Sequence, residues 1–179
     1  MKESFSNIDF YNELETDLPT STAAQRKVWA SVIVNNDLDI KKLSTLLHCN
    51  KKIALRFSWL LSEIGALNPN KLLVELPYLL NQSKQIDHFN FTESFATYWL
   101  ISGVPLENES RAIDLLFQWI LSNQINVTTK SRALKVLIHI TKKYPELKNE
   151  FSICLHDQID KHSKGFKKKA IKVLTELKQ

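Results

Sequence analysis

Apolar residues recur at helical spacing along almost the whole chain after residue 20. Within each stretch they fall three or four positions apart, which places them on one face of an α-helix. Short polar segments, with the few glycines and prolines, separate the stretches. The pattern predicts helices over residues 20–34, 38–49, 50–65, 70–82, 90–102, 109–123, 126–144, 145–161 and 164–178.

Particular residues mark the predicted ends of these helices. Asn50 has the side chain of a helix N-cap, and Pro145 occupies the first turn of a helix, which proline tolerates. Pro77 lies inside the segment 70–82, so we expect a kink or a split after Leu76. Residues 1–18 predict a short acidic helix, in which the apolar positions are Phe5, Ile8, Phe10 and Leu14.

The composition supports an all-α fold. The 179 residues include only 3 glycines and 5 prolines, fewer than the turns of a β-sandwich or a doubly wound α/β domain usually need. The first residues form no apolar leader, and no segment approaches the ~20 apolar residues of a membrane span. Two cysteines are too few for a disulfide framework. We therefore expect a soluble, cytoplasmic, all-helical protein.

An internal repeat is visible when the predicted helices are aligned. Alanine is followed by apolar residues one and three places later, except that Thr97 takes the first of these places in the second copy. Successive alanines are separated by 42, 37 and 37 residues, and an amphipathic helix precedes each copy, so the unit is a helical pair of about 40 residues. The four alanines are Ala54, Ala96, Ala133 and Ala170.

This period and core pattern resemble HEAT-like repeats, the helical pairs of α-solenoids. The resemblance covers residues 37–179 and implies an α-α superhelix of about four pairs, with a capping helix over residues 20–34. It predicts a single domain over residues 19–179, preceded by the acidic segment 1–18. The chain is also similar to short bacterial helical proteins of unassigned function. Some of these carry the label adenylosuccinate lyase, but this chain lacks the signature loop of that enzyme. A bundle without repeats is the alternative fold.

Basic residues recur at fixed places in the repeat. The positions two before and two after each alanine are four apart, so they share a helix face. The resemblance implies that these second helices line a concave surface, which can contact many charges of an extended partner. We predict a binding surface for phosphate or carboxylate groups, made of Lys52, Arg56, Tyr98, Lys135, Lys168 and Lys172. The alternative is that these lysines only keep the surface soluble.

The charge distribution agrees with such a surface. Residues 1–17 carry one basic and five acidic side chains, whereas residues 130–179 carry 13 basic and five acidic ones. A concentration of like charge can attract an acidic protein, a nucleic acid or an anionic membrane. The acidic segment 1–18 is therefore a candidate competitor that folds over the basic surface or docks on a second copy of the chain.

No arrangement typical of a catalytic or metal site is apparent in the sequence. The chain has no Gly-x-Ser-x-Gly motif, and its three isolated glycines do not form a phosphate-binding loop. His156 and Asp160 are four apart, but two ligands do not make a metal site. Some HEAT-like proteins are DNA glycosylases that use a concave aspartate and tryptophans. Here Asp114 stands alone on its helix face, and we expect core packing for Trp29, Trp59, Trp99 and Trp119.

These observations favour a non-enzymatic binding scaffold without a cofactor or a bound metal. Its expected partner is a protein or an acidic peptide. The alternative is a nucleic-acid-binding protein related to alkylpurine DNA glycosylases, which would use the same basic residues. A third hypothesis places the C-terminal helix, residues 164–178, on an anionic membrane.

Overall fold

The protein is helical throughout the part of the chain that the computed structural model describes, residues 7–87 and 89–178. The chain divides into two compact units, Met1–Pro105 and Leu106–Gln179. This division lies within the segment 19–179 that we expected to form a single domain.

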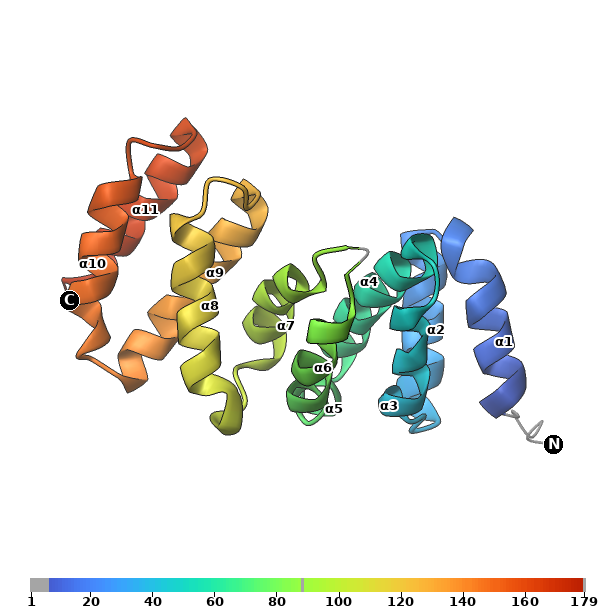
Figure 1. Ribbon diagram of the computed structural model, residues 1–179. Coiled ribbons are helices and arrows are strands. Elements are labelled where there is room, and N and C mark those ends of the chain that lie inside the picture. Colours follow the sequence, from blue (N-terminus) through green and yellow to red (C-terminus); the bar gives the residue numbers. More distant parts are fainter. Residues whose placement is uncertain (1–6, 88, 179) are drawn as a thin grey trace. The chain divides into compact units, whose positions relative to one another are not determined.

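The first unit contains seven α-helices and four short 3-10 helices among its described residues (Figure 1). The α-helices are α1 (Asn7–Asp17), α2 (Ala23–Asn35), α3 (Ile40–Leu43), α4 (Lys51–Leu67), α5 (Pro69–Leu73), α6 (Leu76–Gln82) and α7 (Phe95–Ser102). The 3-10 helices are η1 (Leu18–Thr20), η2 (Ser44–His48), η3 (Ser83–Gln85) and η4 (Phe91–Ser94).

Side-chain caps explain where the main helices begin. Thr22 and Gln25 form a capping box at the start of α2, in which each side chain bonds the backbone N–H of the other residue. Asn50 accepts hydrogen bonds from two backbone N–H groups at the start of α4, as predicted. The segment 70–82 is split near Pro77, but before Leu76 rather than after it, because α5 ends at Leu73 and α6 begins at Leu76 with Pro77 in its first turn.

Helix α4 is the centre of the first unit and packs against α2, α5 and α7. Phe57, Leu60 and Leu61 of α4 are fully buried. Gly65 allows α5 and α7 to approach α4 closely, because a Cβ atom on it would lie 2.6 Å from Cδ2 of Leu72. The sequence pattern placed the end of this helix at Gly65. In the structure Gly65 lies inside α4 and leaves space for the neighbouring helices.

The part of the acidic segment that the structure describes forms helix α1 and packs into the first unit. Phe10 and Leu14 are buried. Nε1 of Trp29 donates a 2.8 Å hydrogen bond to Oε1 of Glu13, and Oγ1 of Thr45 donates one of 3.2 Å to the hydroxyl of Tyr11. Phe5 lies outside the described residues. Helix α1 is thus part of this unit's core.

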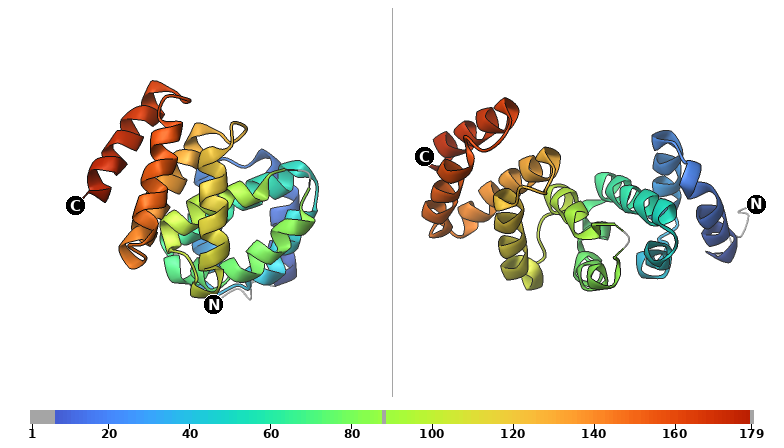
Figure 2. Two further views of the ribbon diagram at one scale, coloured as in Figure 1. Left: turned by 60° about the vertical axis from the view of Figure 1, so that its left-hand side comes forward. Right: turned by 45° about the horizontal axis from the view of Figure 1, so that its top comes forward.

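The second unit contains four α-helices preceded by a 3-10 helix (Figures 1 and 2). These are η5 (Leu106–Asn108), α8 (Glu109–Leu121), α9 (Val127–Lys143), α10 (Leu147–Gln158) and α11 (Lys164–Leu177). Helix α8 packs against α9, and α10 packs against α11. The two pairs also contact each other, because α8 touches α10 and α9 touches α11.

The four alanines of the sequence pattern are buried. All four side chains are fully buried, one each on α4, α7, α9 and α11.

None of the helices in the described ranges is both long and apolar enough to cross a bilayer.

Candidate functional site

Two of the predicted binding residues lie on one face of α4, which we call the α4 face. Lys52, Arg56, Trp59 and Glu63 are spaced four, three and four apart, so they follow one another along this face. Lys52 is exposed and Arg56 is half-buried. Trp59 is 41% exposed, which corrects our expectation that it belongs to the core. The other tryptophans, Trp29, Trp99 and Trp119, are buried as expected.

Helix α2 adds a second arginine to the α4 face. The guanidinium carbons of Arg56 and Arg26 lie 4.5 and 5.1 Å from the ring centroid of Trp59. Nη1 of Arg26 donates hydrogen bonds to the carbonyl and the hydroxyl oxygen of Ser21, at 2.9 and 3.1 Å. Arg26 itself is only 6% exposed. The cations and the indole therefore form one cluster.

The positive charge of this cluster lacks an acidic partner within the described part of the chain. Neither arginine forms an ion pair there within 4.0 Å. Burial lowers the pKa of Arg26, and the nearby charge of Arg56 lowers it further. Glu63 opposes the shift, but it lies too far away for an ion pair. The α4 face is thus a cationic surface around an exposed indole.

Tyr98 does not belong to a binding surface, and its inclusion in the predicted set is wrong. Its side chain is fully buried, and its hydroxyl donates a 2.8 Å hydrogen bond to the carbonyl of Ser58 on α4. Its ring contacts Phe91 and Phe95, with centroids 6.3 and 5.3 Å away. Burial raises the pKa of its hydroxyl. The physical reason is that α4 covers the face of α7 on which Tyr98 lies.

The other predicted residues, Lys135 of α9 with Lys168 and Lys172 of α11, form a surface that we call the α9/α11 face. Two contacts join these helices. Nζ of Lys169 lies 2.9 Å from Oγ of Ser131, and Nζ of Lys142 lies 3.7 Å from Oε1 of Glu176.

The spacing along each helix locates the lysines between these contacts. Lys135 lies between Ser131 and Lys142 on one face of α9, and Lys172 lies between Lys169 and Glu176 on one face of α11. Lys135 and Lys172 are therefore neighbours across the junction, and Lys168 is one turn before Lys172.

Several lysines of the second unit, unlike these three, are paired with carboxylates. Lys143 pairs with Glu109 at 2.6 Å, Lys161 with Asp157 at 2.7 Å and Lys167 with Asp160 at 2.5 Å. By contrast, Lys135, Lys168 and Lys172 are exposed, and no carboxylate within the described ranges lies within 4.0 Å of their amines. The α9/α11 face thus has uncompensated positive charge. The α4 face belongs to the first unit and the α9/α11 face to the second.

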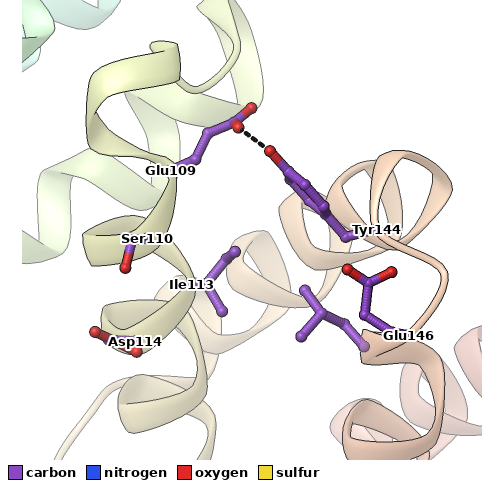
Figure 3. A pocket seen from close by; sticks show the side chains of 7 residues that line it. Glu109, Ser110, Ile113, Asp114, Tyr144 and Glu146 are labelled. Carbon is purple, nitrogen blue, oxygen red and sulfur yellow. Dashed lines mark hydrogen bonds between the residues drawn. The ribbon is translucent and has the colours of Figure 1, made fainter.

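A cavity of about 260 Å³ lies beside the α9/α10 turn of the second unit (Figure 3). Glu109, Ser110, Ile113 and Asp114 of α8 line one side, and Tyr144, Glu146 and Leu147 line the other. The hydroxyl of Tyr144 donates a 2.5 Å hydrogen bond to Oε2 of Glu109. Three carboxylates give this cavity a negative character.

Glu109 is already engaged by its neighbours in this cavity. Burial alone would raise the pKa of its carboxyl, but hydrogen bonds from Lys143 and Tyr144 outweigh burial and lower it. Asp114 is exposed, whereas Trp119, the only tryptophan of the second unit, is buried. A carboxylate beside an exposed tryptophan, which the glycosylase hypothesis requires, therefore does not occur within this unit.

A cluster of Lys130, His162 and Cys154 lies inside the second unit. Lys130 is 1% exposed, and its Nζ donates to the carbonyl of Ile120 at 3.1 Å and lies 2.8 Å from Nε2 of His162. Burial lowers the pKa of both side chains, and the charge of Lys130 further lowers that of His162. Burial also raises the pKa of the nearby Cys154 thiol to about 11. Lys130 and Cys154 are therefore too buried to act as accessible nucleophiles.

Neither known family models nor curated proteins nor solved structures match this chain. Across the residues that the structure describes, no three His, Cys, Asp or Glu side chains come together as a metal site would need. The candidate site therefore depends on the geometry of the two basic faces.

Sequence reasoning missed Arg26 and the exposure of Trp59. Arg26 lies outside the repeat alignment, since it precedes the first repeated pair. Trp59 follows Arg56 by three positions and Lys52 by seven, so helical spacing alone places it with the predicted basic residues. That spacing was the available signal for Trp59, whereas only packing of α2 against α4 brings Arg26 to the site.

Proposed function

We propose that this protein is a non-enzymatic binding scaffold whose α9/α11 face binds an acidic segment of a partner protein. The observation that carries the proposal is the set of three exposed lysines on one face, none of which has a carboxylate of the described residues within 4.0 Å of its amine. Neighbouring like charges repel each other, and an acidic partner would relieve that repulsion.

An exposed apolar side chain favours a protein partner over a nucleic acid. Ile171 is 47% exposed and lies three positions after Lys168, on the same side of α11. An acidic peptide with interspersed apolar residues can bury this isoleucine and neutralise the lysines together. A phosphate backbone offers nothing apolar for Ile171 to contact.

We further infer that the helices are stacked HEAT-like pairs of an α-solenoid. The inference is supported by the pairing of α8 with α9 and of α10 with α11, and by the contacts that join the first helices and the second helices of these pairs. The buried alanines at matching positions support it as well. In such an array, successive second helices form a continuous surface for an extended partner.

The test is a binding titration with a labelled acidic peptide. The probe is a fluorescein-labelled peptide of four Glu-Glu-Leu-Glu repeats, titrated with the full chain and followed by fluorescence anisotropy. Reversing Lys135 and Lys172 to glutamate should weaken binding more than about tenfold, because two contacts become repulsive at close range. Reversing Lys27 and Lys84, which are exposed in the first unit, is the control with the same net charge and should change affinity less than about twofold.

A labelled DNA duplex, titrated over a salt series, tests the alternative partner. Binding to DNA requires several phosphate contacts, so its affinity decreases steeply as the salt concentration rises. The affinity of a peptide site with apolar contacts decreases less. Peptide binding that is weakened in the Lys135/Lys172 variant and kept in the Lys27/Lys84 variant supports the proposal. Tight, salt-sensitive binding of DNA alone, lost in the same variant, would replace it with a nucleic-acid function.

A further inference from the structure

Arg26 is a buried cation that lacks a counterion among the described residues. Of its three guanidinium nitrogens, only Nη1 has hydrogen-bond acceptors there, both from Ser21. Nε is buried and has no acceptor. Buried arginines are usually paired with an acidic group, because removing the charge from water is costly. The protein therefore holds a cation at the α4 face whose usual partner is missing.

Trp59 is exposed directly beside this cation. Arginine and tryptophan are enriched at the centres of protein interfaces, where they contribute a large share of the binding free energy. Here two guanidinium groups lie over one indole ring. Lys52 lies one turn before Arg56 on the same face. The cluster therefore combines an apolar contact surface with donors suited to a planar anion.

We propose that Arg26, Arg56 and Trp59 form an anchor site for a carboxylate side chain of an acidic peptide, with an apolar neighbour of that carboxylate packing on the part of Trp59 that the two arginines leave exposed. The carboxylate would accept hydrogen bonds from the guanidinium groups and reduce their mutual repulsion. The proposal takes the same class of partner as the proposed function but uses different residues, all in the first unit.

A nucleic acid is a weaker fit to this cluster. Single-stranded nucleic acids bind aromatic residues by stacking their bases on an open ring face. The two guanidinium groups lie over the ring of Trp59 and occupy surface that a base would need. An acidic side chain requires no free ring face, since it binds the cations themselves.

The experiment uses the full chain and the same Glu-Glu-Leu-Glu peptide. In the background of the Lys135/Lys172 reversal, where only the α4 face remains to bind the peptide, Arg56→Gln and Trp59→Ala should each weaken the remaining binding about tenfold or more, as expected for interface anchors. Their matched controls are Lys51→Gln, which also removes one positive charge from α4, and Val74→Ala, which removes another exposed apolar side chain. In the same background both controls should bind like the Lys135/Lys172 variant, and circular dichroism confirms that each variant is folded.

A second readout locates the bound peptide. Trp59 is the only exposed tryptophan of the four, so it dominates quenching of the intrinsic fluorescence by acrylamide. Saturating peptide should reduce this quenching in the parent chain but not in Trp59→Ala.

The outcomes separate this proposal from the function proposed above. Loss of binding in the α4 variants supports the anchor site. Unchanged affinity and quenching in these variants would overturn it, while the Lys135/Lys172 reversal decides the α9/α11 face independently. Binding of a labelled oligothymidine that protects Trp59, with no binding of the peptide, would assign the cluster to nucleic acid instead.

Discussion

Lys130 is the most buried charged side chain among the described residues, and its neighbours explain how it is tolerated. Its amine donates to the carbonyl of Ile120, in the last turn of α8, where the helix dipole favours a positive charge. Its other neighbour is Nε2 of His162. Nε2 also lies 3.0 Å from Oε1 of Gln158. An ammonium has no lone pair, so a charged Lys130 donates to Nε2 only when His162 is neutral and carries its proton on Nδ1.

We predict that acid destabilises the second unit through His162. Burial and the Lys130 charge lower the pKa of His162 from the ordinary 6.5, so the unfolded chain binds a proton more readily than the folded one. The stabilising contribution is therefore present above about pH 6.5 and is lost as the pH falls through the lower pKa of the folded state. Urea unfolding followed by circular dichroism should show the parent chain losing stability as the pH falls from about 7.5 to 5.5.

His162→Gln is the matched variant for this prediction. Glutamine can accept a hydrogen bond from Lys130 but does not titrate. Its stability should vary less with pH over the same range. If the free energy of unfolding changes equally with pH in the parent chain and in the variant, a role for His162 is contradicted. Lys161, the other charged neighbour that acts on His162, is present in both chains and does not account for a difference.

Tyr98 and Trp59 show how far a residue type predicts its surroundings. Trp59 lies on α4 and Tyr98 on α7, and we expected the tyrosine at the surface and the tryptophan inside. The structure reverses the two. Tyr98 faces α4, which satisfies its hydroxyl through Ser58, whereas Trp59 lies on the side of α4 that carries Lys52 and Arg56.

At the scale of elements, helix starts depend on local side-chain bonds that the sequence already displays. The capping residues of α2, α4 and α9 are Thr22, Asn50 and Asn126, and each lies at or close to the predicted boundary. Such caps satisfy backbone N–H groups that have no partner inside the helix.

We predict that Thr22→Ala lowers the free energy of unfolding by about 1 kcal/mol, the usual cost of losing an N-cap. The substitution removes the acceptor for the N–H of Gln25 and breaks the capping box. Urea unfolding of the two chains measures the difference. Thr22→Ser, which keeps the cap, serves as the control, and a loss of equal size in both variants would contradict the capping explanation.

The segment 38–49 shows where local pattern was insufficient. Its leucines predicted one helix, whereas the structure has the short α3 followed by η2. Asp39 caps the start at Ile40, and the hydroxyls of Ser44 and Thr45 bond the carbonyls of Lys41 and Lys42. These hydroxyls compete with the helical hydrogen-bond pattern, and such competition is difficult to read from apolar spacing.

At the scale of the whole molecule, the net charge belongs to the second unit. Residues 106–179 carry 14 basic and 8 acidic side chains, whereas residues 1–105 carry 10 and 11. The second unit thus holds a net charge of +6 and the first a net charge of −1. Long-range attraction of an acidic partner should therefore be directed to the second unit.

Removal of residues 1–18 tests whether the acidic segment is a competitor or part of the core. Because Phe10, Leu14 and Leu18 are buried, we predict a loss of several kcal/mol of stability, at about 1.5–3 kcal/mol for each large apolar side chain. Affinity for the Glu-Glu-Leu-Glu peptide should stay unchanged in the folded protein. Thermal unfolding and anisotropy titration measure the two quantities.

Leu14→Ala provides a control that keeps every acidic residue of this segment. It should lose about 2–5 kcal/mol of stability and bind the peptide like the parent chain. Tighter peptide binding after removal of residues 1–18, but not in Leu14→Ala, would show that the acidic segment competes with the partner.

The sequence by itself determined the helical class, most helix boundaries, the buried alanines and the helix faces on which Lys52, Arg56, Lys135, Lys168 and Lys172 lie. These properties follow from spacing, caps and breaks, which act over a few residues. Only the tertiary structure decided that Tyr98 is buried, that Trp59 is exposed beside Arg26, and that Lys135 and Lys172 are neighbours. These outcomes depend on which helix covers which face, and that choice is made by packing between residues up to 40 positions apart, beyond the reach of a local pattern.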